Sequence, residues 1–168
     1  MQGYTNKLRI YIAGPLFSDA EREYNECLNN FLKRLGFETF LPQHDGHKLS
    51  DLLDKDFPKS VAIDTIFKKD IEEIQKSDIL VFIMDGRIPD EGACVEVGYA
   101  YSLGKECIGL KTDCRSLMSG LDNPLILGTI KNRVAKNLKE LETFLFQIKE
   151  KKVNVSLSYP ENKDLVLA

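Results

Sequence analysis

Residues 79–84 of this 168-residue chain read ILVFIM, an apolar run in which polar and apolar positions do not alternate. Such a run is typical of a central parallel strand that helices cover on both faces. The turn DGRIPDEG follows at 85–92, and an apolar segment at 93–103 then predicts a helix. This succession of strand, turn and helix indicates an α/β protein.

Shorter segments on both sides of this run continue the alternation of strand and helix. Strands are predicted at 8–12, 37–41, 106–110 and 130–135, and helices at 18–35, 60–76, 124–128 and 137–149. The polar stretch 43–55 predicts a long loop, and the aperiodic residues 151–168 predict a tail after a single domain at 1–150. We expect an α/β fold with one doubly wound, mostly parallel five-stranded sheet and helices on both faces, of the Rossmann or flavodoxin type.

The composition limits the classes of partner. The chain is 43% hydrophobic and 29% charged with a net charge of -3, so it lacks the basic surface that binds a nucleic-acid backbone. No apolar run approaches the roughly 20 residues that span a bilayer, and the start MQGYTNKLRIYIAG does not resemble a signal peptide. We expect a cytoplasmic protein with small-molecule ligands and without nucleic-acid or membrane partners.

Two acids lie where this fold binds ligands, beyond the carboxyl ends of the strands. Asp90 is in the turn after the central strand, and Glu96 is about one turn inside the following helix. A helix N-terminus favours an ionised carboxylate, which suits a nucleophile or the stabiliser of a sugar cation. The alternative is a capping Asp90 and a solvated Glu96, but the apolar neighbours of Glu96 favour a partly buried, functional acid.

Five segments together carry a resemblance to a known family. They are IYIAGPLF at 10–17, Glu21 with Tyr24, LPQHDG at 41–46, KKDIEEIQKSDI at 68–79 and DEGACVEVGYA at 90–100. In this order and spacing they resemble the nucleoside 2-deoxyribosyltransferase family over most of residues 8–130. The resemblance implies a pentosyltransferase of nucleotide salvage that exchanges the base of 2′-deoxynucleosides without a cofactor or a metal ion.

The same resemblance implies a role for particular residues. Glu96 resembles the nucleophile that forms a covalent 2-deoxyribosyl ester, Asp70 the acid that protonates the departing base, and Asp90 the residue that holds the 5′-hydroxyl. The implied substrate-binding residues are Tyr11, Gly14, Phe17, Gln43, Asp45 and Asn123, the last acting from a neighbouring subunit. Simpler interpretations stay open: a surface charge for Asp70, a helix cap for Asn123, and core packing for Tyr11 and Phe17.

The chemistry of the bond agrees with this assignment. Breaking a glycosidic bond develops oxocarbenium character, which a nearby carboxylate can stabilise or trap. A trapped sugar ester permits a second base to attack, with ping-pong kinetics and retained configuration. His44 and His47 are weak metal-ligand candidates because no cluster accompanies them, and His44 is expected in the wall of the site.

Two departures and two rival functions remain. Pro124 follows Asn123 where the family has another residue, which leaves open whether a neighbouring subunit completes the site. Cys94 stands where the family has a small or hydroxylated residue, which leaves open how strictly ribose is excluded. We expect an even-numbered homo-oligomer built from dimers, up to a tetramer or hexamer. The rivals are an N-glycosidase acting on nucleosides or 5′-monophosphates and a non-catalytic nucleotide-sensing domain. The apolar loop 14–17 favours nucleosides, and three acids together favour an enzyme.

Overall fold

A computed structural model describes residues 7–55, 57–116 and 120–158. These residues form one sheet in the order β2-β1-β3-β4-β5, and every neighbouring pair is parallel. The strands are β1 (Arg9–Ala13), β2 (Glu38–Phe40), β3 (Ile79–Ile83), β4 (Glu106–Leu110) and β5 (Val134–Ala135). The expected doubly wound α/β fold is confirmed, with a fully parallel sheet. Its strand order reverses between β1 and β3, which is where such sheets bind ligands.

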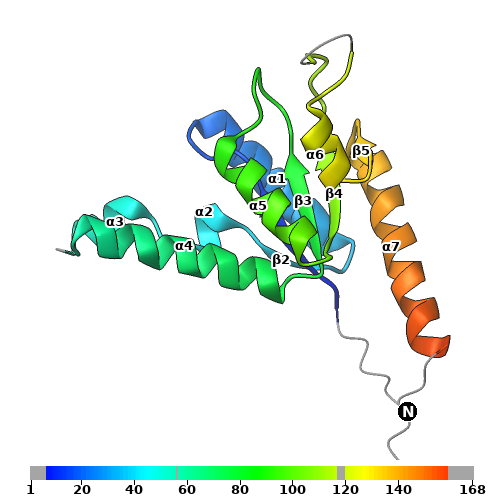
Figure 1. Ribbon diagram of the computed structural model, residues 1–168, viewed down its shortest axis with the longest axis horizontal. Coiled ribbons are helices and arrows are strands. Elements are labelled where there is room, and N and C mark those ends of the chain that lie inside the picture. Colours follow the sequence, from blue (N-terminus) through cyan, green and yellow to red (C-terminus); the bar gives the residue numbers. More distant parts are fainter. Residues whose placement is uncertain (1–6, 56, 117–119, 159–168) are drawn as a thin grey trace, which may run out of the picture.

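The helices cover both faces of the sheet (Figure 1). They are α1 (Asp19–Arg34), α2 (Pro42–Asp45), α3 (Leu49–Leu53), α4 (Lys59–Lys76), α5 (Glu91–Ser102), α6 (Pro124–Thr129) and α7 (Leu138–Ser158). The first and last of these pack on one face, and α4, α5 and the end of α6 pack on the other. Within the described ranges, no helix combines the length and the apolar character needed to cross a membrane.

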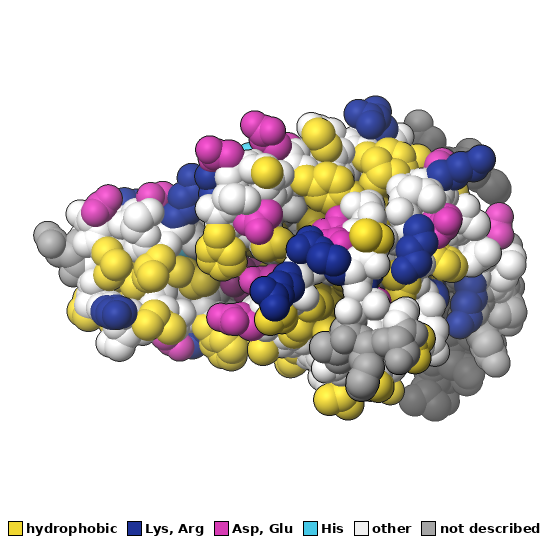
Figure 2. All heavy atoms as spheres, turned by 90° about the horizontal axis from the view of Figure 1, so that it is seen from above, with side chains coloured by type: hydrophobic (Ala, Val, Ile, Leu, Met, Phe, Trp, Pro, Cys, Tyr) yellow, Lys and Arg dark blue, Asp and Glu magenta, His cyan; other side chains and the backbone are white. Residues whose placement is uncertain are grey.

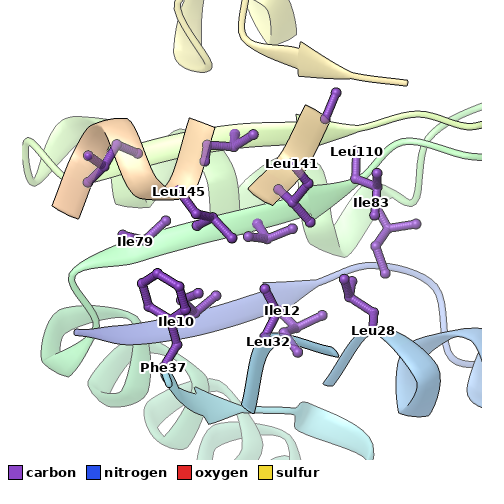
Figure 3. Packing of buried hydrophobic residues seen from close by; sticks show 14 of the residues in the cluster. Ile10, Ile12, Leu28, Leu32, Phe37, Ile79, Ile83, Leu110, Leu141 and Leu145 are labelled. Carbon is purple, nitrogen blue, oxygen red and sulfur yellow. The ribbon is translucent and has the colours of Figure 1, made fainter. Parts of the chain in front are cut away.

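Alternation along the strands divides the core into two layers. Ile10 and Ile12 of β1 point toward α1 and α7 and meet Leu28, Leu32 and Leu141, as Figure 3 shows. Tyr11 and Ala13 point the other way, toward α4 and α5. All five residues of β3 are buried, as the unbroken apolar run predicts. Truncating side chains such as these to alanine costs about 2–5 kcal/mol each.

Capping side chains fix where the helices around the sheet edge begin. Ser18 and Glu21 form a reciprocal capping box at α1. Asp90 accepts a hydrogen bond from the backbone N–H of Ala93 at 2.8 Å and so caps α5. Asn123 caps α6 through the N–H of Leu125 at 2.9 Å. The capping interpretation of Asp90 and Asn123 is therefore confirmed, and it leaves room for a second role.

Several predicted boundaries are wrong. The segment 43–55 is not a continuous loop, because it holds most of α2 and all of α3. The last strand is confined to Val134–Ala135, because Lys131 and Asn132 take left-handed backbone conformations that end α6 in a turn. Helix α7 continues to Ser158, so part of the predicted tail is helical, and residues 159–168 lie outside the described residues.

The exposed side chains of α4 differ from what its sequence predicts. The apolar positions of 60–76 predict one broad apolar face that includes Ile63 and Phe67, but these side chains are 52% and 59% exposed. The helix packs instead through Ala62, Glu73 and Ile74, which are buried, and it carries the short α3 along its first half. Figure 1 shows α3 and the start of α4 extending beyond the sheet. The outer half of α4 thus has little of the sheet to cover.

Candidate active site

The site is built around a hydrogen bond between a strand and a helix. The Tyr11 hydroxyl donates to Oε1 of Glu96 at 2.6 Å. Tyr11 is fully buried in β1, and its ring stacks on Phe40 of β2 with 5.3 Å between the centroids. A side chain packed in this way has no freedom to swing. Its hydroxyl therefore orients the Glu96 carboxyl from a fixed position.

Burial, and not the helix dipole, controls the charge of Glu96. Burial raises the pKa of Glu96 to about 8, and the nearby Asp70 and Asp90 carboxylates act in the same direction. The hydrogen bond from Tyr11 lowers the pKa, but not enough to cancel the rise. The expectation that the helix N-terminus holds Glu96 ionised is wrong. Glu96 is the sixth residue of α5, beyond the first turn where free N–H groups act.

Asp70 supplies a second carboxyl with a raised pKa. It lies on α4 and is half-buried, and burial raises its pKa to about 6 against the opposing charges of His47 and Lys69. Among the described residues, no cation lies within ion-pairing distance of its carboxylate. Because Asp70 affects the titration of both Tyr11 and Glu96, the three groups share one electrostatic environment. An acid with this pKa is suited to proton transfer near neutral pH.

Asp90 brings a third carboxyl to the same place. While it caps α5, its charge also raises the pKa of Glu96 and of the Cys94 thiol. Asp70 and Asp90 therefore both lie close enough to Glu96 to affect its charge. The negative charges of Asp70 and Asp90 favour the protonated form of Glu96, because like charges at close range repel each other.

A cleft of about 700 Å³ is lined by Asp70, whereas Asp90 and Glu96 are not among its lining residues. Its walls come from the loop after β1, from α1, from the segment that holds α2 and α3, and from α4. They comprise Leu16, Phe17, Arg22, Pro42, Gln43, His44, Gly46, His47, Lys48, Leu49, Ser50, Ile66 and Asp70. Phe17 is 76% exposed, which excludes core packing as the reason for an aromatic residue there. Figure 2, which looks onto the end toward which β3 points, shows acidic and basic side chains among hydrophobic ones in the middle of this face. An apolar wall beside acids suits a flat, partly polar ligand.

Comparison with known proteins identifies the family of the chain. A family model described as "Nucleoside 2-deoxyribosyltransferase" matches residues 10–155. The chain belongs to this family. None of the curated proteins matches the sequence significantly.

Several solved structures have a similar fold. A conserved protein from Enterococcus faecalis V583 is 27% identical with a TM-score of 0.68, over 84% of this chain and 98% of that one. A 2-deoxyribosyltransferase from Bacillus psychrosaccharolyticus is 22% identical with a TM-score of 0.62, over 80% and 90%. A CMP N-glycosidase from Clostridium botulinum is 20% identical with a TM-score of 0.52, over 82% and 97%. A 2-deoxyribosyltransferase and a CMP N-glycosidase therefore share the fold of this chain.

Two residues of the LPQHDG segment have local partners in this structure. The Gln43 side-chain amide accepts from Asn25 at 3.0 Å and donates to Glu26 at 2.7 Å and to the Arg22 carbonyl at 3.1 Å. Asp45 accepts from the backbone N–H of Leu41 at 2.8 Å. Gln43 lines the cleft but uses its amide to hold α1, and Asp45 stabilises α2. His44, in the cleft wall as expected, pairs with Glu26 at 2.6 Å.

Asn123 lies apart from the main cleft. It is exposed and lines a second, smaller pocket of about 190 Å³ together with Cys94, Lys111 and Asp122. The structure therefore does not bring Asn123 to the same cavity as Asp70 and Phe17. Its predicted contact with a sugar hydroxyl of a neighbouring subunit stays a prediction.

The close packing of the loop after β1 explains why position 14 is a glycine. A Cβ atom at this position would lie 2.8 Å from Cβ of Ile83, so the loop after β1 passes against the end of β3. A side chain there would push the loop outward. Gly14 thus positions the loop that carries Phe17.

Sequence reasoning missed Glu73 in α4. This residue is 3% exposed, and its carboxylate contacts Arg9, Lys69 and Lys76. The signal was present, because Ala62, Ile66, Asp70 and Glu73 follow the spacing of one helix face. An acid on the face that carries Asp70 should have been expected to point inward.

Proposed function

We propose that this protein is a nucleoside 2-deoxyribosyltransferase of nucleotide salvage, which exchanges the base of 2′-deoxynucleosides through a covalent 2-deoxyribosyl ester on Glu96. The observation that carries the proposal is the 2.6 Å hydrogen bond from the buried Tyr11 hydroxyl to Glu96, beside a second protonatable carboxyl, Asp70. A fixed nucleophile and a proton donor are what a double-displacement mechanism requires. Membership of the family supports the same chemistry.

In the first half-reaction, an oxygen of ionised Glu96 attacks the anomeric carbon of the nucleoside. The bond from this carbon to the base nitrogen breaks, and its electron pair stays on the base. Asp70 donates its proton to the base, which then leaves as a neutral molecule. Tyr11 holds the attacking carboxylate and stabilises its charge while the bond forms.

In the second half-reaction, a nitrogen of the incoming base attacks the same carbon from the face that the first base left. The ester bond breaks and Glu96 recovers its charge, while Asp70 takes the proton released by the new base. Two inversions give net retention, and the two bases bind in turn, as in ping-pong kinetics. Phe17 in the cleft wall is placed to stack on either base.

Charges of both signs surround the second pocket. Lys111 there pairs with Asp122 and Arg115 pairs with Asp113, whereas the exposed Arg87 in the same wall has no ion pair among the described residues. The acid Asp90 near the same pocket would oppose a phosphate. A phosphate-binding hydrolase, like the CMP N-glycosidase of similar fold, is the second candidate.

The test is incubation of the purified protein with deoxyinosine, with and without free adenine, followed by chromatography of the products. We expect deoxyadenosine from the wild type and a loss of at least about 10³-fold in Glu96→Ala. Glu91→Ala is the matched control, because it removes an exposed acid from the first turn of the same helix. Intact-mass and peptide analysis of an acid-quenched reaction should place one deoxyribosyl group on Glu96.

Other products would contradict the proposal in distinct ways. Free deoxyribose without a new nucleoside would identify a hydrolase. Turnover of 5′-monophosphates but not nucleosides would identify a nucleotide enzyme. Binding of nucleotides without any turnover would favour a sensing domain.

The remaining expectations belong to the same proposal. We place the reaction in the cytoplasm and expect an even-numbered homo-oligomer in which Asn123 reaches a neighbour's sugar. Light scattering of the wild type and of Asn123→Ala tests the assembly. Loss of activity in Asn123→Ala without a change of mass would support a role in the site.

A further inference from the structure

Glu73 is a buried acid to which the proposed chemistry gives no role. Its Oε2 accepts from the Arg9 guanidinium, and its Oε1 lies 3.1 Å from Lys69 Nζ and 3.0 Å from Lys76 Nζ. One cation would be enough to neutralise a carboxylate. The convergence of three on a side chain that is 3% exposed indicates that Glu73 organises its neighbours as well as being stabilised by them.

The neighbour that matters is Lys69, the residue before Asp70. While Glu73 holds its ammonium, Lys69 Nζ also lies 5.6 Å from the centroid of the Phe40 ring, within cation–π distance. Phe40 stacks on Tyr11, and Tyr11 donates to Glu96. A continuous line of contacts therefore runs from Glu73 through Lys69, Phe40 and Tyr11 to the proposed nucleophile.

We propose that Glu73 is a positioning residue that holds the Lys69 ammonium on the Phe40 ring, so that the cation does not pair with the adjacent Asp70. This inference rests on the proposed function, in which Asp70 must be protonated to release the base. An ammonium released from Glu73 would be free to approach the adjacent Asp70, whose titration the charge of Lys69 already affects. A paired Asp70 would be ionised and would have no proton to give.

The charged groups around Asp70 set the balance between its protonated and its ionised form. His47, from the segment between α2 and α3, and Lys69 both favour the ionised form of Asp70. Glu73 and burial oppose them, and Glu96 of α5 shares the environment together with Tyr11 of β1. Glu73 thus acts twice, through its own negative charge and through its hold on Lys69. Removing Glu73 and removing Lys69 should therefore change Asp70 in opposite directions.

The experiment is a carboxyl-carbon NMR titration of Asp70 in the full chain. We expect Glu73→Gln to lower the titration midpoint of Asp70 and Lys69→Met to raise it, each by about half a pH unit. Lys76→Met is the matched control. It removes an equal charge from the same carboxylate but leaves the contact of Lys69 with Phe40, so the midpoint should stay unchanged. Midpoints that move together, or that do not move in folded variants, would overturn the proposal.

Turnover gives a second readout. At pH 7 we expect kcat/KM for base exchange to fall about threefold in Glu73→Gln and to rise about threefold in Lys69→Met, which is half a pH unit expressed as a fold-change. A purely structural role would lower both. Absence of exchange in the wild type would refute the proposed function, while the titration would still test the positioning role. If Glu73→Gln does not fold, Glu73→Asp replaces it, because the shorter side chain should loosen its contact with Lys69 and again lower the Asp70 midpoint.

Discussion

Two inward-facing glutamates on neighbouring helices meet the same strand and end in opposite electrostatic states. Glu73 of α4 meets Arg9 of β1, and Glu96 of α5 meets Tyr11, two residues further along the same face of the strand. Lys76, Lys69 and Arg9 hold the pKa of Glu73 below its usual value, whereas burial raises that of Glu96 to about 8. The partner on the strand is a cation in one case and a neutral hydroxyl in the other.

The two glutamates show that burial alone does not decide whether an acid stabilises the fold or is available for a reaction. A carboxylate surrounded by cations is stabilised in its charged form and has little tendency to react. A carboxylate whose only partner is a neutral donor has no cation to neutralise its charge, so it can stabilise the positive charge of an oxocarbenium-like transition state. We infer that the change from Arg9 to Tyr11 along β1 separates the scaffold from the site.

The largest expected effect comes from removing the neutral donor. Tyr11→Phe should lower kcat/KM for base exchange by about 10²-fold, because Glu96 loses the hydroxyl that orients and stabilises its charge. Tyr24→Phe is the control, since the Tyr24 hydroxyl is buried and has no hydrogen-bond partner among the described residues. Steady-state kinetics measures both variants, and equal losses of kcat/KM would contradict the role given to the Tyr11 hydroxyl.

A second effect concerns stability, where the two glutamates should respond in opposite ways. At pH 7, Glu73→Gln should lower the free energy of unfolding by about 2 kcal/mol, because three cations lose their common partner. Glu96→Gln should raise it by about 1–2 kcal/mol, because the folded chain no longer has to bury an acid that is ionised when unfolded. Urea unfolding measures both, and Glu72→Gln, at an exposed neighbour, is the control.

The pH dependence of these stability changes follows from the direction of each pKa shift. The folded pKa of Glu96 lies above its unfolded value, so the wild type loses stability as pH rises from about 4.5 to about 8. The folded pKa of Glu73 lies below it, so its contribution is present above pH 4.5 and is lost in acid. The gap between the two variants should therefore widen as pH rises. A gap that stays constant with pH would contradict this account.

The smallest effect is on the shape of the pH–rate profile. Glu96 must lose its proton to attack, and Asp70 must keep its proton, so activity needs one proton on the pair. With pKa values of about 6 and about 8, kcat/KM should follow a bell with its maximum near pH 7. In Asp70→Asn the profile should rise and level off without an alkaline decline. Persistence of that decline would assign it to another group.

Much of the fold could be predicted because it depends on local patterns. The run ILVFIM at 79–84 predicted β3, and the capping residues Ser18, Asp90 and Asn123 predicted the starts of three helices. The end of α7 and the extent of β5 were predicted wrongly, because the length of a helix or strand depends on what it packs against. Ile63 and Phe67 stay exposed for the same reason, since that half of α4 extends beyond the sheet.

The sequence by itself determined the order of the five strands and of every helix except α2 and α3, together with the family, because caps, periodicity and motif spacing act between residues near in the chain. It also predicted Asp70, Asp90 and Glu96 as the acids of the site. The tertiary structure decided which partner each acid has. It places Tyr11 against Glu96 and Arg9 against Glu73, pairs that are 85 and 64 residues apart in sequence. It also left Gln43 bound to α1 and Asn123 in a separate pocket. The charge of a buried acid depends on desolvation and on neighbours from distant segments, so the folded chain sets it.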